Sequence, residues 1–176
     1  MFKKSLLAAI IVSGFSFNAA QAVDGTINFT GKIIAAACDI KTGDENQTKA
    51  LGDVNKTAFT NPGDVASSVN VSINVENCDA AIANARVVFD GTRDATNNQL
   101  LKINGTSPAA GVGIALYEGN GTTLIPMGGA SLPVPVNTTT NDAELKFVAK
   151  YMATSAVAGI TEGDANGTAE FTMQYQ

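Results

Sequence analysis

The chain of 176 residues contains no histidine and no tryptophan, and it has only two cysteines. Histidine is the commonest general base and the commonest metal ligand, so its absence removes the usual carrier of both chemistries. No serine, lysine or carboxylate lies with a partner base in a recognisable catalytic motif. The sequence therefore argues against an enzyme, and we expect no catalytic residue, no metal, no cofactor and no small-molecule substrate.

Positive charge is also scarce. The chain has 11 lysines and arginines against 16 acidic residues, a formal net charge of −5. Proteins that bind nucleic acid or anionic lipid usually carry a basic patch, and no such cluster stands out. We therefore expect neither nucleic acid nor a lipid surface as a partner.

The first 22 residues have the order of a secretory signal peptide. Lys3 and Lys4 precede a largely apolar run at residues 6–17, and Ala20-Gln21-Ala22 is a small-x-small cleavage site. The run is too short for a membrane span, which takes ~20 residues. We predict a signal peptide at residues 1–22 and a mature start at Val23; an uncleaved anchor is the alternative.

The two cysteines are Cys38 and Cys78. In an exported protein an isolated pair predicts one disulfide. Closing a loop of about 40 residues contributes about 4 kcal/mol in the chain-entropy model. A redox or zinc motif is excluded because the spacing does not fit one.

Residues 23–33 alternate between small or apolar residues and polar ones, a period typical of a strand with one buried face. No turn or hairpin partner lies beside this segment, which we call the arm. We predict that the arm lies outside its own core and completes a neighbouring copy. The alternate small or apolar residues of this predicted donor strand are Val23, Gly25, Ile27, Phe29, Gly31 and Ile33.

Short alternating segments recur through residues 34–176, which we predict to form one domain. The sequence 118–121 is a strong hairpin signal, and Pro133 and Pro135 confine their neighbourhood to edges and loops. Eight or nine short strands without a sustained helical period predict an antiparallel, immunoglobulin-like β-sandwich. The predicted strands are 50–54, 67–78, 86–89, 100–103, 112–117, 122–125, 145–152 and 168–176.

The arm, the cysteines and the C-terminal strand together resemble chaperone–usher fimbrial subunits of the type 1 pilus major-subunit family. The resemblance covers nearly the whole mature chain, with Tyr175 in the penultimate position and Gly163 fourteenth from the end. The segments that carry it are 25–34, 37–38, 75–78, 147–153 and 171–176.

The resemblance implies an incomplete immunoglobulin-like fold that lacks its last strand, which a partner supplies. A periplasmic chaperone lends a strand first. At the outer-membrane usher, the arm of an identical or related pilin subunit replaces it, and a surface fimbrium for cell adhesion grows. The residues expected to border the open groove are Gly163, Ala169, Phe171, Met173 and Tyr175.

Two glycines of the arm affect how it would fit into the groove of a neighbouring subunit. By resemblance, Gly31 occupies the position where a side chain would clash in the groove; a bulge or turn glycine is the alternative. Gly25 departs from the family, because many subunits carry a bulkier apolar residue there. We expect this departure to weaken engagement at one groove pocket.

Two alternatives to the shaft subunit are a minor pilin of the same fibre and an adhesin. A minor adaptor or tip-proximal pilin of the same fibre is poorly separated from the shaft subunit by sequence. A carbohydrate-binding adhesin is disfavoured, because tip adhesins carry a lectin domain ahead of the pilin domain. Asp39, Asp44 and Glu45 lack the spacing of a calcium loop and indicate solvated loop acids.

Overall fold

The computed structural model describes residues 25–31, 37–106 and 108–176. The chain divides into two units between Ile33 and Ile34. In residues 25–31 the backbone forms no regular element, and the side chains of Ile27 and Phe29 are 79% and 91% exposed. The predicted donor-strand residues Val23 and Ile33 lie outside the described residues.

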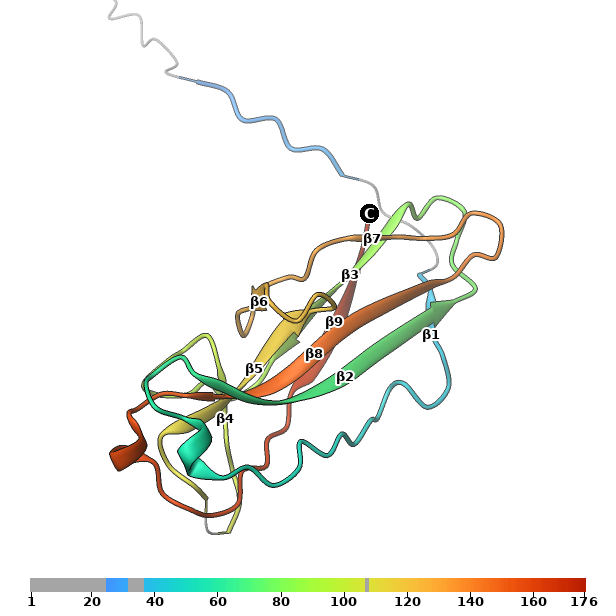
Figure 1. Ribbon diagram of the computed structural model, residues 1–176. Helices are drawn as coiled ribbons and strands as arrows, with labels where there is room; N and C mark the ends of the chain where they lie inside the picture. The colour runs from blue at the N-terminus through green and yellow to red at the C-terminus, as the bar shows by residue number, and fades with distance from the viewer. Residues whose placement is uncertain (1–24, 32–36, 107) are drawn as a thin grey trace, which may run out of the picture. The chain divides into compact units, whose positions relative to one another are not determined.

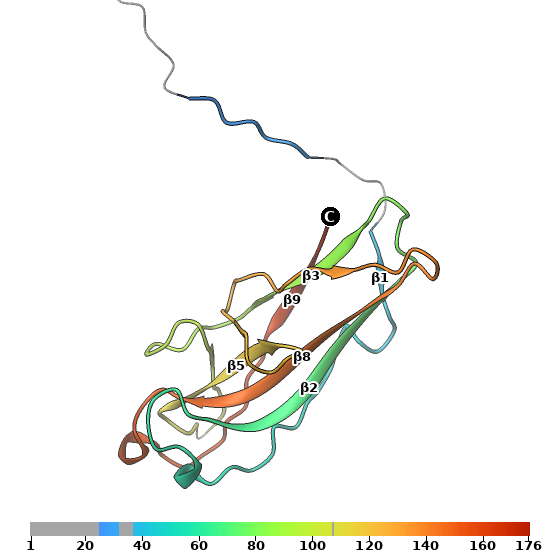
Figure 2. The ribbon, with the colours of Figure 1, turned by 45° about the horizontal axis from the view of Figure 1, so that its top comes forward.

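Residues 37–176 contain two antiparallel β-sheets (Figures 1 and 2). Sheet A has the strand order β1-β2-β8-β5-β4, with β6 paired to β5, and sheet B has the order β7-β3-β9. The strands of sheet A are β1 (Asp39–Ile40), β2 (Val65–Glu76), β4 (Leu101–Lys102), β5 (Val112–Glu118), β6 (Leu124–Ile125) and β8 (Ala143–Ala153). The strands of sheet B are β3 (Asn84–Asp90), β7 (Val134–Pro135) and β9 (Glu170–Tyr175).

Helical structure is confined, in the described residues, to the short 3₁₀ turns η1 (Lys56–Ala58) and η2 (Val157–Gly159). The side chain of Asn55 caps η1 by accepting a hydrogen bond from the backbone N–H of Thr57. Neither turn has the length or the apolar composition needed to cross a membrane.

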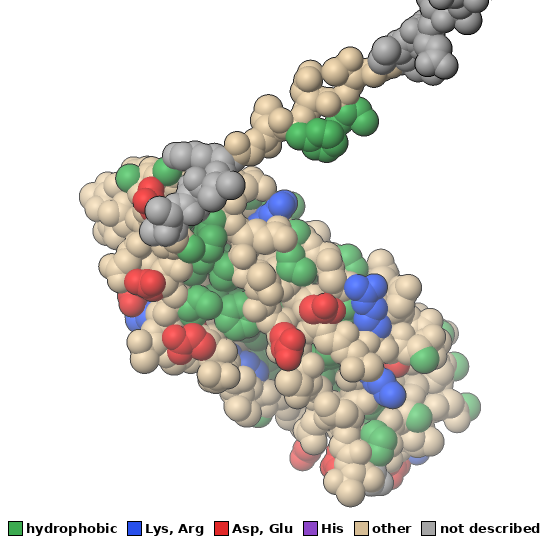
Figure 3. All heavy atoms as spheres, turned by 180° about the vertical axis from the view of Figure 1, so that it is seen from behind, with side chains coloured by type: hydrophobic (Ala, Val, Ile, Leu, Met, Phe, Trp, Pro, Cys, Tyr) green, Lys and Arg blue, Asp and Glu red, His purple; other side chains and the backbone are tan. Residues whose placement is uncertain are grey.

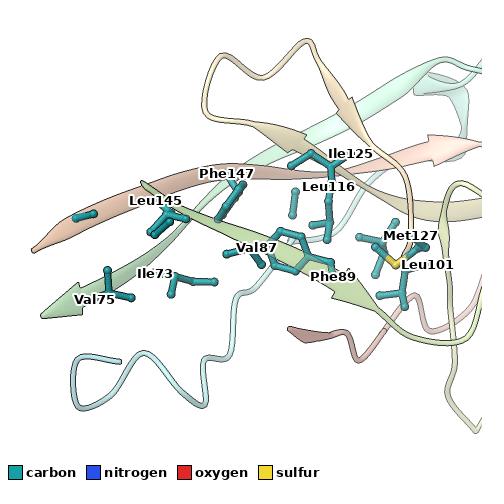
Figure 4. Packing of buried hydrophobic residues seen from close by; sticks show 14 of the residues in the cluster. Ile73, Val75, Val87, Phe89, Leu101, Leu116, Ile125, Met127, Leu145 and Phe147 are labelled. Carbon is teal, nitrogen blue, oxygen red and sulfur yellow. The ribbon is translucent and has the colours of Figure 1, made fainter. Parts of the chain in front are cut away.

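The core lies between the two sheets and is built by strand alternation (Figure 4). Leu145, Phe147 and Ala149 of β8 are all buried, while Glu144 and Lys146, which flank Leu145, are exposed. The ring of Phe147 meets that of Phe89 from β3 edge to face, with centroids 4.9 Å apart. Aromatic pairs prefer this arrangement, and here it joins the two sheets.

Most predicted strands are present, so the prediction of an all-β sandwich is confirmed. The prediction of a strand at residues 50–54 is wrong, because its backbone finds no ladder partner among the described residues. The strand β7 was not predicted, and its position at the edge of sheet B agrees with the expectation that Pro133 and Pro135 favour edges.

The predicted disulfide between Cys38 and Cys78 is present. Both cysteines are buried, and beside them Asp39 and Ile40 of β1 pair with Glu76 and Val75 of β2. The disulfide therefore ties the start of the body to the end of its longest strand, across a sequence separation of 40 residues.

Candidate functional site

An open groove of about 1020 Å³ runs along one side of the body. Its first wall is the segment 47–54, extended by Lys56 and Phe59, and its second wall is the segment 160–169. Seen from behind, hydrophobic side chains show on the surface of the body between charged ones (Figure 3). The apolar residues of the groove floor are Ala109, Val112, Ile114 and Tyr151.

The first wall lies between β1 and β2 but belongs to neither sheet (Figure 1). Side chains hold it in place: Gln47 Nε2 donates to the Ser72 carbonyl at 2.7 Å, and Ser67 Oγ donates to the Leu51 carbonyl at 2.6 Å. From residue 48 to residue 54, no backbone N–H donates to a backbone group within the described part of the chain. These donors are therefore available to another strand.

The second wall is held from its far side by the segment 104–110. The backbone N–H groups of Asn104 and Ala109 donate to the carbonyls of Asn166 and Asp164, at 2.7 and 2.9 Å. Isolated bridges pair Asn166 with Asn104 and Asp164 with Pro108 on this far side. The groove thus has an apolar floor between a first wall whose backbone donors have no backbone partner in the described chain and a second wall that pairs with the segment 104–110.

Two glycines shape the second wall. Gly163 has a φ of 154°, in a region that residues with side chains rarely adopt. A Cβ placed on Gly167 would lie 2.7 Å from Cδ1 of Ile114 in the floor, so the end of that side chain would have to move to admit it. The backbone favours glycine at position 163, and the close packing favours it at position 167.

The strand β9 follows directly after the second wall and is paired on one edge only, with β3. Gln176 and Asn84 exchange both of their backbone hydrogen bonds. Because such pairs alternate along an antiparallel ladder, the N–H and C=O groups of Phe171, Met173 and Tyr175 point away from β3. Within the described residues no strand pairs with this second edge.

Two tyrosines connect the site to its surroundings. The hydroxyl of Tyr151 donates to the carbonyl of Ala165 at 2.9 Å, which ties the floor to the second wall. Burial raises the pKa of Tyr151, and the carboxylate of Asp53 adds to the increase. Tyr175 donates to the carbonyl of Cys38 at 3.3 Å, and the pKa of this phenol is also raised, mainly by burial.

A single ion pair joins the two walls among the described residues. Lys56 Nζ lies 3.0 Å from Oε1 of Glu162, and both side chains are substantially exposed. Exposed pairs of this kind contribute little to stability, at most ~1 kcal/mol. The walls are therefore not locked together by electrostatics.

The predicted groove residues fall into two sets. Gly163 and Ala169 line the groove as part of its second wall. Phe171, Met173 and Tyr175 do not line the cavity itself; they are half-buried on the inner face of β9 and pack against the core.

Sequence reasoning missed the first wall and most of the floor. Leu51 and Val54 pack against the core from a segment with no ladder, and Ile114 and Tyr151 reach the groove from sheet A. The residues that build the site come from chain segments about 100 positions apart, and only the fold brings them together. No group of acidic or cysteine side chains in the described residues is arranged to hold a metal.

Comparison with known proteins identifies the family. The family model for fimbrial protein matches residues 27–176. The type-1 fimbrial protein A chain of Salmonella typhi is 36% identical, over 86% of this chain and 83% of its own length. The long polar fimbria protein A of Salmonella typhimurium is 35% identical, over 100% of this chain and 96% of its own length.

The fold agrees with this assignment. The crystal structure of the P pilus rod subunit PapA matches with a TM-score of 0.64 and 22% identity, over 80% of this chain and 100% of that one. The relatives are structural fimbrial proteins, which confirms the prediction that this chain is not an enzyme. The chain belongs to the fimbrial protein family.

Proposed function

We propose that the chain is a structural subunit of a surface fimbrium, and that copies polymerise when the arm of one, residues 23–33, fills the open groove of the next. The observation that carries this proposal is the groove itself. It combines an apolar floor with a first wall whose backbone N–H groups, in residues 48–54, have no backbone partner within the described chain. An extended strand satisfies both features at once, because it offers backbone groups along its edges and side chains to the floor.

The free edge of β9 extends the same binding surface. Phe171, Met173 and Tyr175 each direct an N–H and a C=O outward, and their half-buried side chains leave part of the core open beside them. An added strand would pair with these three residues and cover the exposed parts of their side chains. An edge left in this state is an aggregation hazard unless another chain covers it.

The arm has the properties that such a strand needs. Ile27 and Phe29 are exposed, with polar residues between and beside them. Each contributes about 1.5–3 kcal/mol if it is fully buried in a neighbour's groove. At ~3.3 Å per residue, the eleven residues of the arm span roughly 36 Å, about the length of a small sandwich. Gly31 would fit at the point where a side chain clashes.

The route to the fibre follows from the same features. Residues 1–22 direct export to the periplasm as a signal peptide, and residues 34–176 form the pilin domain. A periplasmic chaperone supplies a strand to the groove, because an uncovered groove and sheet edge would promote aggregation. At the outer-membrane usher the arm of the next subunit replaces that strand. The product is a fimbrium on the bacterial surface that serves adhesion.

A peptide exchange experiment tests the proposal. The subunit is isolated in complex with its periplasmic chaperone and mixed with a synthetic peptide of residues 23–34. We expect the peptide to displace the chaperone, as measured by native electrophoresis, while the same peptide carrying Phe29→Asp does not. Equal behaviour of the two peptides, or no binding of either, would overturn the proposal.

The matched control places the same charge on the other face of the arm. Asn28→Asp adds one carboxylate beside Phe29, but on the polar side of the alternation. In cells, we expect Phe29→Asp to give soluble, chaperone-bound subunit and no fibres by negative-stain microscopy, whereas Asn28→Asp still gives fibres. Loss of thermal stability of the chaperone complex in Phe29→Asp would instead place Phe29 in its own core.

A further inference from the structure

Sheet B has a second edge, on the other side of β3 from β9. It differs from the β9 edge in having no outward-pointing backbone donors. On the far side of β3, the chain runs along that strand through residues 131–136, which include β7 (Figure 1). This segment, which we call the proline edge, contains Pro133 and Pro135. In the described residues no strand pairs with its outer side.

The register fixes which way each residue of the proline edge points. Val136 donates to the carbonyl of Ala83 at 2.9 Å, and Val134 is the partner of Ala85 two residues further along β3. Since inward-bonded residues alternate in an antiparallel ladder, Val134 and Val136 face β3 and Pro135 faces outward. Pro133, on the other side of Val134, belongs to the same outward set.

No backbone N–H of the proline edge is left to donate to another strand. Ser131 donates to the carbonyl of Val87 at 2.7 Å, and the backbone N–H of Leu132 donates to Oε1 of Glu118 at 2.7 Å. The N–H groups of Val134 and Val136 are turned to β3. The two remaining positions are prolines, which have no N–H at all.

Without its prolines, the proline edge would favour pairing with another chain, because it carries apolar side chains. The side chain of Leu132 is 60% exposed there, and Val134 is only half-buried. Apolar side chains along an unpaired edge favour pairing with another chain, and prolines on the edge are one of the devices that prevent it. In β9, by contrast, residues 170–176 contain no proline.

We infer that Pro133 and Pro135 close this edge to strand addition and so leave β9 as the edge of sheet B that can accept a strand. The excluded partner is the same edge of a second copy, which would pair with it antiparallel across a two-fold axis. Within sheet B, strand addition is then confined to the β9 side. The inference builds on the proposed function, because one-sided addition keeps a growing fibre from branching or clumping, but the closed edge itself does not depend on the arm.

The test restores the missing donors in a background where the arm is disabled. The full chain with Phe29→Asp is the parent, and Pro133→Thr with Pro135→Thr is added to it. Self-association is followed over a concentration series by size-exclusion chromatography with light scattering. We expect the added substitutions to lower the concentration at which the chain associates by about tenfold or more. Each threonine supplies a backbone N–H that can donate to a second copy, and its β-branched side chain can pair with a residue across the new ladder.

A control and a second set of variants keep the test decisive. Pro62→Thr in the turn before β2 makes the same chemical change away from the sheet edge and should leave association at the level of the parent. If the double variant is not recovered folded, as judged by circular dichroism, each single substitution is measured instead. Association of the folded variants no stronger than that of the parent would overturn the inference. The peptide exchange result is independent of this outcome, because it concerns only the groove.

Discussion

The strands β8 and β9 have similar sequence patterns but differ in how many strands pair with them and in how deeply their side chains are buried. Both alternate apolar and polar residues, with Phe147 central in one and Phe171 near the start of the other. β8 is hydrogen-bonded on both edges, to β2 and β5, whereas among the described strands β9 is bonded to β3 alone. Phe147 is 2% exposed, while Phe171 is only partly buried.

The difference shows that alternation decides which face of a strand is apolar, and that the number of neighbouring strands decides how deeply this face is buried. In β9 every apolar residue faces the core, but one side of the strand remains open. A strand suited to the middle of a sheet therefore stands at its edge. Four substitutions test this difference between the two strands.

The largest effect is expected in the strand with two neighbours. Phe147→Ala removes a fully buried ring and its edge-to-face contact with Phe89, and should lower the free energy of unfolding by about 3–5 kcal/mol. Urea unfolding followed by circular dichroism measures it. The exposed neighbour Lys146→Ala serves as the control and should change stability by less than about 1 kcal/mol. A similar loss for both would mean that β8 is not the centre of the core.

The next effect concerns binding at the open edge. The backbone N–H of Met173 points away from β3, so Met173→Pro removes a donor that the subunit itself does not use. We expect the affinity for the peptide of residues 23–34 to fall about tenfold or more below that of Met173→Ala, which loses the same side-chain contacts. Fluorescence anisotropy with a labelled peptide measures both. Equal affinities would show that the free edge of β9 takes no part in strand addition.

A smaller effect is expected from the ring of Phe171. The ring of Phe171 is only partly buried in the subunit alone. Phe171→Ala should therefore lower the free energy of unfolding by about 1–2 kcal/mol, less than Phe147→Ala does. With the groove filled by the arm peptide, the cost should rise toward that of the fully buried ring. Thermal unfolding of both variants, with and without peptide, gives the comparison. A cost in the peptide-free subunit equal to that of Phe147→Ala would contradict the open edge.

The smallest effect concerns the hydroxyl at the end of β9. Tyr175→Phe removes the bond to the Cys38 carbonyl and should cost about 1 kcal/mol at neutral pH. Burial, with a contribution from Asp39, holds the pKa of Tyr175 above its ordinary value of 10.0. The phenol therefore contributes stability that is complete below pH 10 and is lost as the pH rises through its raised pKa. Urea unfolding from pH 8 to 11 should show a shallower decline in Tyr175→Phe than in the unchanged chain.

Several elements of the fold were predictable from local patterns. The alternation in residues 67–78 predicted β2, and the Gly-Asn-Gly sequence at 119–121 predicted the hairpin between β5 and β6. The isolated cysteine pair predicted the disulfide. These features succeed because side-chain face, turn conformation and cysteine chemistry depend on neighbouring residues and on the compartment, not on the rest of the fold.

The groove was only partly predictable. Gly163 and Ala169 were placed beside it by resemblance, and both line it. The segment 50–54 looked like a strand because it contains Leu51 and Val54, but it finds no ladder partner and forms a wall instead. A local pattern does not reveal whether a partner edge exists, because ladder bonds join residues far apart in the chain.

The faces of the strands, the position of the disulfide and the alternation of the arm follow from local sequence alone. Which edges are paired depends on the assembled fold. The fold placed Phe171, Met173 and Tyr175 at an edge with outward backbone donors, and Pro133 and Pro135 at the opposite edge without any. The physical reason is that the side-chain period of a strand is a property of its own backbone. The satisfaction of its hydrogen bonds is instead a property of the neighbours that folding brings to it.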